Sequence, residues 1–166
     1  MGLDMYLEAR KYVSQREGIV GHSTYSPEFQ KAASVAPDGL TKYSDFGSAT
    51  VSLPVGYWRK ANAIHGWFVE NVQGSVDDCR QAYVDREQLV ALRDACKSVM
   101  SLTVGVNRDK AAAVGLLPTE GFFFGNTEMD EWYYQDLKYT IEMIDHVLSI
   151  IPENSWEWSF YYHSSW

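Results

Sequence analysis

The longest periodic pattern in the chain lies near its C-terminus and predicts a helix over residues 127–151. Apolar residues recur there every three or four positions, which is the spacing of a helix face packed against a core. Thr127 and Asp130 have the spacing of a capping box, so Asn126 or Thr127 is expected to cap the helix. Pro152 is expected to end it. The apolar residues of the pattern are Tyr133, Leu137, Ile141, Ile144, Leu148 and Ile151.

Patterns of period two elsewhere in the chain predict strands. The clearest is the last one, where Trp156, Trp158, Phe160 and Tyr162 alternate with Glu157, Ser159, Tyr161 and His163. Together with the helices, these strands predict an α+β fold in a single domain, 1–166, with a small, mainly antiparallel sheet of three to four strands and about three helices packed on one face. Strands are expected near residues 3–13, 49–55 and 155–163, with 121–125 as a fourth, and helices near 57–73, 85–100 and 127–151.

Local signals refine this outline. Asp85 and Gln88 have capping-box spacing and should open the helix at 85–100. Cys96 falls on the apolar face of that helix, so it is expected to be a buried hydrophobic residue rather than a nucleophile. Residues 15–42 are rich in Gly, Pro, Ser and Thr, which is typical of a loop. Two short helical segments are expected as well, at Ser26–Ala33 and within Arg108–Leu117.

The stretch Tyr57–Gln73 is expected to hold the functional side chains. Interpreted as one helix, it has an apolar stripe for the core and a second stripe beside it that carries Trp58, Asn62 and His65. A wall that mixes aromatic and hydrogen-bonding groups is typical of a ligand pocket, and Trp58 would offer a flat surface to a ring. The alternative is that all three are border residues of the core, each hydrogen-bonded to a neighbouring segment.

Composition argues against several classes of function. The chain of 166 residues has a net charge of −8, whereas proteins that bind the phosphate backbone of nucleic acids carry clustered Lys and Arg. Cys79 and Cys96 lack the spacing of a zinc site, and the adjacent Asp77 and Asp78 point in different directions, so neither a metal nor a cofactor is expected. No secretory signal and no apolar run of about 18 residues occurs, which predicts a reduced, cytoplasmic protein.

Motifs of the common enzyme classes are absent from the sequence, including GxGxxG, the phosphate-binding loop, HExxH and GxSxG. The histidines nominated as general bases are His65 and His22. The enzyme hypothesis is therefore a small hydrolase or transferase in which His65 acts with a carboxylate from residues 128–131, such as Glu128 or Asp130.

Four blocks of the sequence resemble a family of small, uncharacterised phage and prophage proteins. The blocks are MGLDMYL at the start, YWRKANAIHGWFVENVQ, the DDC of Asp77–Cys79, and LLPTEGFFFGNTEMDEWYYQDL. The resemblance covers most of the chain outside Gln15–Tyr43. The resemblance implies a phage-encoded accessory protein and carries over no catalytic residues. Small phage accessory proteins often counter bacterial defences, either by binding a defence protein or by sequestering a nucleotide signal.

We therefore expect a non-catalytic, counter-defence binding protein that acts in the host bacterial cell. The expected partner is a host defence protein or a small nucleotide-like ligand; nucleic-acid backbones and membranes are not expected, and a homo-oligomer is left open. A further alternative is an acidic mimic of nucleic acid, whose carboxylates copy the spacing of phosphates. The ligand-binding residues expected are Trp58, Arg59, Lys60, Asn62, His65, Phe123 and Glu128.

Overall fold

The fold was obtained as a computed structural model that places most of the chain in two compact units. The large unit consists of Met1–Ala9 and Pro54–Trp166, and the small unit consists of Arg10–Leu53. The residues that the structure describes are 2–17, 24–37, 40, 47–101, 107–121, 124–153, 155 and 157–166.

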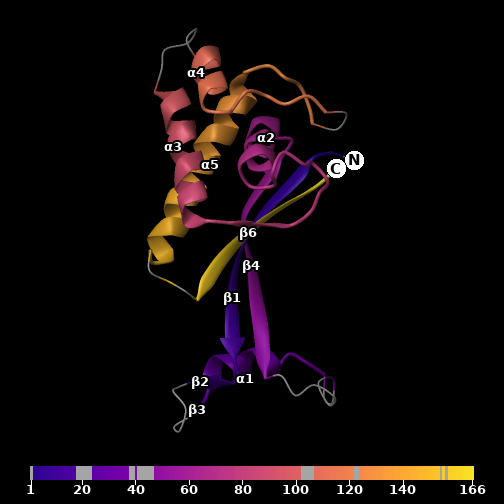
Figure 1. The fold of residues 1–166 in the computed structure, drawn as a ribbon, viewed down its shortest axis with the longest axis vertical. Helices are drawn as coiled ribbons and strands as arrows, with labels where there is room; N and C mark the ends of the chain where they lie inside the picture. The colour runs from indigo at the N-terminus through magenta and orange to yellow at the C-terminus, as the bar shows by residue number, and fades with distance from the viewer. Residues whose placement is uncertain are drawn as a thin grey trace. The chain divides into compact units, whose positions relative to one another are not determined.

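The described chain has the α+β fold expected from the sequence, with a four-stranded antiparallel sheet (Figure 1). The strands of this sheet, in the order in which they are hydrogen-bonded, are β4 (Ser48–Arg59), β1 (Asp4–Ser14), β6 (Trp158–Ser165) and β5 (Ala82–Val84). The helices in the described residues are α1 (Pro27–Ala33), α2 (Asn62–Asn71), α3 (Arg86–Met100), α4 (Asn107–Ala113) and α5 (Glu131–Ile150). About three helices were expected to pack on the sheet; the two short ones, α1 and α4, overlap the short helical segments expected at Ser26–Ala33 and within Arg108–Leu117.

One face of the sheet in the large unit carries the hydrophobic core. In β1, Met5 and Leu7 are buried, whereas Asp4, Tyr6 and Glu8 between and beside them are only half-buried, as the period of a strand requires. Most of the buried hydrophobic side chains of the sheet and of α2, α3 and α5 belong to a single cluster. The helices therefore pack on one face of the sheet, as expected.

An aromatic stack joins α2 to this sheet. The ring of Phe68 lies parallel to that of Tyr162 in β6, with centroids 3.9 Å apart and an interplanar angle of 8°. Trp58 and Trp67 also contact the ring of Phe68 in edge-to-face geometry, with centroid distances of 5.9 and 5.7 Å. Because Phe68 and Tyr162 are both fully buried, this stack fixes the position of α2, which in turn positions the candidate site.

Helices α3 and α5 lie side by side (Figure 1) and are also joined by polar contacts. The Arg86 guanidinium donates to the carbonyl oxygens of Leu148 and Ile151 at 3.0 and 2.7 Å, which satisfies carbonyl groups at the C-terminal end of α5. The capping box of Asp85 and Gln88 is confirmed, since the backbone N–H of Asp85 donates to Gln88 Oε1 at 2.8 Å.

The start of α5 corrects one sequence-based prediction. The helix begins at Glu131, and its cap is Asp130 rather than Asn126 or Thr127, because the Asp130 carboxylate accepts from the backbone N–H of Tyr133 at 3.1 Å. A strand at 121–125 is not found in the described part of that segment, where Gly121, Phe124 and Gly125 lie outside any strand.

The junction between β4 and α2 corrects a second prediction. Residues 57–59 belong to β4, and the helix begins at Asn62 rather than at 57. The strand is prolonged by pairing with the N-terminal segment, where the backbone N–H of Lys60 donates to Leu3 O at 2.8 Å. The chain then turns sharply, because Lys60 adopts a left-handed conformation (φ 59°) and Ala61 has the dihedral angles of an inverse γ-turn.

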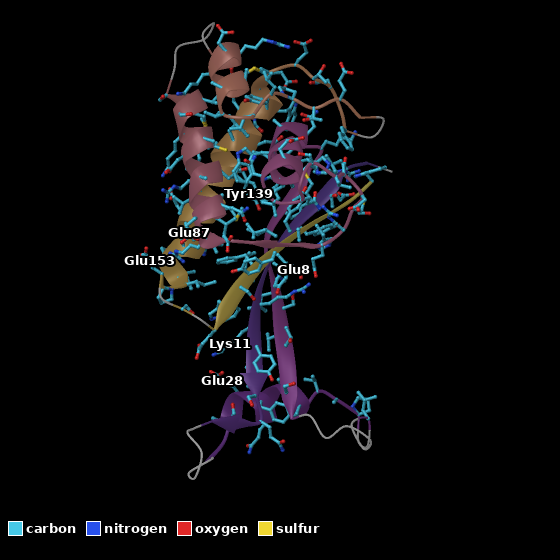
Figure 2. All side chains as sticks on the ribbon, in the orientation of Figure 1. Glu8, Lys11, Glu28, Glu87, Tyr139 and Glu153 are labelled. Carbon is cyan, nitrogen blue, oxygen red and sulfur yellow. The ribbon has the colours of Figure 1, made fainter. Side chains whose placement is uncertain are left out.

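The small unit contains its own short sheet, in which β2 (Arg16–Glu17) pairs antiparallel with β3 (Thr24–Tyr25). The expected helical segment at Ser26–Ala33 is confirmed as α1, with Ser26 Oγ accepting from the N–H of Phe29 at 3.2 Å. An ion pair of 2.8 Å between Lys11 and Glu28 joins α1 to the part of β1 that belongs to this unit (Figure 2).

Candidate functional site

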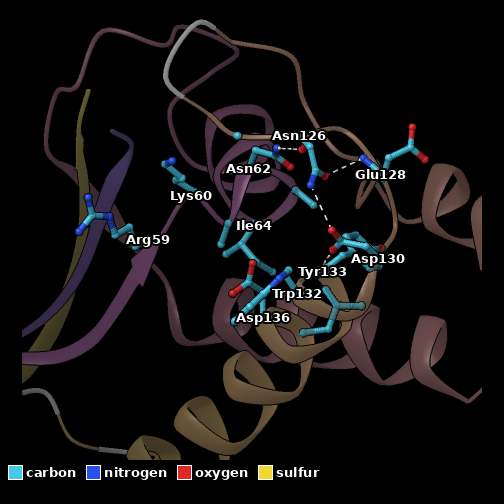
Figure 3. Close-up of a pocket in the computed structure, with 14 residues that line it drawn as sticks. Arg59, Lys60, Asn62, Ile64, Asn126, Glu128, Asp130, Trp132, Tyr133 and Asp136 are labelled. Carbon is cyan, nitrogen blue, oxygen red and sulfur yellow. Dashed lines mark hydrogen bonds between the residues drawn. The ribbon is translucent and has the colours of Figure 1, made fainter. Parts of the chain in front are cut away.

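A hollow of roughly 530 Å³ opens in the large unit between the start of α2 and the first turns of α5 (Figure 3). We call it the main hollow. Cationic side chains come from the end of β4, and carboxylates come from the loop before α5 and from α5 itself, so the two sides differ in charge. The lining residues are Arg59, Lys60, Ala61, Asn62, Ala63, Ile64, Gly125, Asn126, Glu128, Asp130, Trp132, Tyr133, Asp136 and Leu137.

The basic side of the main hollow combines two cations with the start of α2. Arg59 and Lys60 are exposed. The left-handed backbone conformation of Lys60, which costs about 1–3 kcal/mol, determines the direction in which the chain enters α2. The first turn of α2 has no side-chain cap and no acidic residue. Because the first N–H groups of a helix lack intrahelical partners and carry a partial positive charge, this end of the hollow favours an anion.

The acidic side is built on the loop that leads into α5. Asn62 of α2 holds this loop, since its Nδ2 donates to Phe124 O at 3.2 Å and to Asn126 O at 2.8 Å. The Asn126 side chain accepts from Glu128 N at 3.0 Å and donates to Asp130 at 3.1 Å (Figure 3). Hydrogen bonds from the backbone N–H of Tyr133 and from Asn126 lower the pKa of Asp130. Asp130 therefore stays ionised at neutral pH.

Asp136 and Trp132 occupy one ridge of α5 beside the hollow. They are four residues apart and so lie next to each other on the helix surface. Trp132 is 72% exposed, whereas Asp136 is half-buried. Burial, with a smaller contribution from Asp130, raises the pKa of Asp136 from its ordinary value of 3.8 to about 6. Two carboxyl groups with pKa values shifted in opposite directions thus line one hollow, that of Asp130 because it caps α5 and that of Asp136 because it is buried.

The structure brings together four of the residues that the sequence nominated. Arg59, Lys60, Asn62 and Glu128 all line the main hollow. Phe123 lies outside the described residues, and so does His22. The side-chain N–H groups of Asn62 donate to carbonyl groups of the loop before α5, so this residue has a structural role in the hollow.

Trp58 does not line the main hollow. It lies in β4 rather than on a helix, is 2% exposed, and donates from Nε1 to Thr140 Oγ1 at 2.8 Å inside the core. The prediction that it offers a stacking surface in a pocket is wrong, because the strand alternation turns its side chain toward the helices. The alternative of a hydrogen-bonded core residue describes it correctly.

His65 is fully buried and its ring is held at both nitrogen atoms. Nε2 lies 3.0 Å from Asp77 Oδ2, and Nδ1 lies 2.8 Å from the hydroxyl oxygen of Tyr162. A carboxylate can only accept, so Nε2–H donates to Asp77 and the Tyr162 hydroxyl donates to Nδ1 in the neutral ring. Trp166 also donates from its indole to Asp77 Oδ1, at 3.1 Å. His65 therefore joins α2 to β6 and to the loop that follows α2 by hydrogen bonds.

This arrangement corrects the proposed pairing of His65 with Glu128 or Asp130. Those carboxylates line the main hollow, whereas His65 lines a separate hollow of roughly 250 Å³ together with Asp77. A fully buried ring with both nitrogens engaged has no position open for a substrate proton. The neighbouring Asp78 accepts from the backbone N–H of Arg80 at 3.1 Å, so the two adjacent aspartates serve different local contacts.

Replacing Asp77 by alanine should destabilise the fold by about 1–3 kcal/mol, because it leaves the buried Nε2–H of His65 without its acceptor. Chemical unfolding followed by tryptophan fluorescence measures the loss. Asp78→Ala is the matched control, since its side chain is solvent-exposed, and it should change the free energy of unfolding by no more than about 0.5 kcal/mol. Equal losses in the two variants would contradict the structural role assigned to His65.

Asp136 and Trp132 are among the residues of the main hollow that sequence reasoning missed. A signal was present for Trp132, because a tryptophan that falls off the apolar stripe of a strongly periodic helix must face solvent or a ligand. Asp136 gave no such signal. Its position one turn after Trp132 is visible in the sequence, but its burial depends on α2 and its preceding turn, which lie more than sixty residues away.

Within the described ranges, no group of three or more histidine, cysteine, aspartate or glutamate side chains is arranged to hold a metal ion. Cys96 is fully buried, as expected, and burial raises its pKa to about 12. None of the helices in the part of the chain that the structure places is long and apolar enough to span a bilayer.

Comparison of the chain with protein-family models, with curated proteins and with solved structures returns no match. The site is therefore interpreted from its own geometry and charge.

Proposed function

We propose that the protein is a non-catalytic binding protein whose main hollow holds a small nucleotide-like ligand. The observation that carries the proposal is the division of charge in the hollow, with Arg59, Lys60 and the start of α2 on one side and Asp130 and Asp136 on the other. A ligand that fits must be anionic at one end and must present hydrogen-bond donors at the other.

The basic side supports a phosphate. An uncapped helix N-terminus next to Arg and Lys is a favourable anion site, because backbone N–H groups, the helix dipole and the side-chain charges act in the same direction. The start of α5 has the opposite character, since Asp130, Glu128 and Glu131 are concentrated there. A phosphate is therefore attracted to the α2 side of the hollow and repelled from the α5 side, which fixes the orientation of the ligand.

The ridge of α5 supports a planar ring with donor groups. Stacking of a base on an exposed tryptophan stabilises binding by about 1–3 kcal/mol. Trp132 is 72% exposed and is the more exposed of the two described aromatic residues, Trp132 and Tyr133, that line the main hollow. The adjacent carboxylate of Asp136 accepts hydrogen bonds from amino groups or ring N–H groups. A volume of roughly 530 Å³ is in the range of small-molecule sites.

The wider role in the proposal is that of a phage-encoded protein that counters a bacterial defence in the cytoplasm of the host. Its support is the resemblance of four sequence blocks to small phage and prophage proteins. Sequestering a nucleotide signal of the host is the form of this role that the charge division of the main hollow favours. Binding a host defence protein is the second form.

Thermal shift with a panel of ribonucleoside monophosphates, cyclic dinucleotides and the parent nucleosides tests the proposal. At least one nucleotide should raise the melting temperature, and its nucleoside should bind about ten- to a hundredfold more weakly because charge-assisted hydrogen bonds to the phosphate are lost. Trp132→Ala should weaken binding about tenfold or more.

The charged side is tested by the double variant Arg59→Gln/Lys60→Gln, which should abolish the shift. Lys138→Gln is its matched control, because Lys138 is an exposed lysine of α5 that does not line the main hollow. A panel without any binder, or a shift that survives both the double variant and Trp132→Ala, would refute the proposed site.

A further inference from the structure

Five rings form a row across the sheet of the large unit, on the face opposite the helices. The ring of Tyr6 in β1 stacks on His163 of β6 with centroids 4.9 Å apart and planes inclined by 16°. On its other side Tyr6 contacts Tyr57 of β4 at 5.4 Å. Tyr83 of β5 meets Tyr161 of β6 at 5.8 Å, and these two residues are direct partners in the β5–β6 register. We call these five side chains the aromatic row.

The aromatic row faces outward because of the strand period. In β6 the buried side chains of Phe160 and Tyr162 alternate with Tyr161 and His163, so the latter two must lie on the face away from the helices. At the two ends of the row, Tyr57 is 46% exposed and Tyr83 is 54% exposed. A soluble sheet usually carries small polar or charged side chains on its solvent face, whereas here four strands each contribute at least one ring.

In the parts of β1 and β4 that belong to the large unit, the charged side chains that the strand period places on this face are two carboxylates and one guanidinium group. Asp4 accepts a hydrogen bond of 2.5 Å from the hydroxyl group of Tyr57, and the strand period places Glu8 (labelled in Figure 2) on the same side of β1. Arg59, which is also one of the residues that line the main hollow, is the cation that the same alternation places there in β4. With a net charge of −8 for the whole chain, the surroundings of the row repel phosphate backbones and further copies of this acidic protein.

We infer that the aromatic row is a docking surface for an arginine-bearing segment of a partner protein. Charge complementarity selects a basic partner, and the rings select arginine over lysine. A guanidinium group is planar, stacks on aromatic faces and is more weakly hydrated than an ammonium group, so it makes cation–π contacts at a lower desolvation cost. None of the five rings is among the residues that line the main hollow, and the row is the kind of surface that the second form of the proposed role, binding a protein, requires.

Titration of the intact protein with two synthetic peptides of equal length and charge, one of alternating Arg and Gly and one of alternating Lys and Gly, tests this inference. The arginine peptide should bind about tenfold more tightly than the lysine peptide, since several cation–π contacts are gained. Tyr6→Val/Tyr83→Val keeps β-forming side chains in both strands but removes two rings, and it should lose that preference. Tyr12→Val is the matched control, because Tyr12 is an exposed tyrosine of β1 that does not belong to the row.

Thermal unfolding of each variant accompanies the titrations. If the double variant does not fold, Tyr83→Val alone is decisive, because Tyr83 is more than half exposed and its substitution removes one end of the row. Equal binding of the two peptides would overturn the inference by showing a charge effect without stacking. Preferential binding of single-stranded oligothymidylate would also overturn it, since the row would then be a platform for bases.

Discussion

Phe68→Ala is expected to be among the most destabilising substitutions in the chain, with a loss of about 3–5 kcal/mol in the free energy of unfolding. Phe68 is fully buried and contacts three aromatic rings at once, those of Tyr162, Trp58 and Trp67. Removing its ring opens a cavity whose walls come from α2, β4 and β6. A loss of that size is a large share of the 5–15 kcal/mol by which domains are ordinarily stable.

Denaturant unfolding monitored by tryptophan fluorescence measures this effect. Phe68→Leu should lose clearly less than the alanine variant, because most of the buried volume is retained. Trp132→Ala is the surface control and should stay within about 0.5 kcal/mol of the wild type, since its side chain is 72% exposed. A loss below about 1 kcal/mol for Phe68→Ala would contradict the packing of α2 on the sheet.

Asp136→Asn is expected to stabilise the protein at pH 8, by up to about 3 kcal/mol, because one pKa unit corresponds to about 1.4 kcal/mol. Burial raises the pKa of Asp136 from 3.8 to about 6, so the folded protein holds this proton more tightly than the unfolded chain does. Stability contributed by this carboxyl group is therefore present below pH 4, falls as pH rises toward 6, and stays lost above it. The advantage of the asparagine variant should therefore run in the opposite direction: absent near pH 4, growing as pH rises toward 6, and complete above it.

Asp145→Asn on the same helix is the matched control, with the opposite sign. The hydrogen bond from Lys97, together with the charges of Lys97 and Arg93, lowers the pKa of Asp145, so its ionised form stabilises the fold and the asparagine variant should be slightly less stable at pH 8. Unfolding curves at pH 4, 6 and 8 separate the two cases. If Asp136→Asn were no more stable than the wild type at pH 8, the burial of that carboxyl group would be refuted.

A residue that destabilises the fold in its ionised form is often retained because of what it binds. Asp136 has this character, and it lies beside an exposed tryptophan in a hollow with a basic opposite wall. Loss of ligand binding together with a gain in stability in Asp136→Asn is therefore the combination that the proposed function implies.

The sequence allowed good prediction of elements whose signal is local. The apolar stripe of α5, the capping box at Asp85 and Gln88, and the alternation of β6 each depend on side chains within a few positions of one another. The fold class follows from these elements, because a sheet with one apolar face needs helices to cover it.

Prediction failed where distant pairing overrides a local pattern. The spacing of Tyr57, Ala61, Ile64 and Phe68 fits a helix, yet residues 57–59 are drawn into β4 by pairing with the N-terminal strand. Moving the helix start to Asn62 removes Trp58 from the helix and places it in the core. The same boundary puts Arg59 and Lys60 at the end of a strand, beside the uncapped start of α2.

The site was predicted in part for the same reason. Arg59, Lys60 and Asn62 are consecutive or nearly so in the sequence, and Glu128, which was included with them among the expected ligand-binding residues, lines the same hollow. The partner of His65 and the burial of Asp136 depend on contacts across the fold that periodicity does not encode. His65 was therefore placed in the wrong site, and Asp136 was not placed in any.

We expect a nucleotide-like ligand to bind in the main hollow rather than near Trp58 or His65. Chemical-shift mapping of ¹⁵N-labelled protein titrated with the best nucleotide of the panel tests it most directly, because each of the six tryptophans has its own indole N–H signal. The account predicts shifts at the Trp132 indole and at the backbone amides of Ala63 and Ile64, with the Trp58 indole unchanged. Shifts that leave Trp132 and the start of α2 unaffected would contradict it.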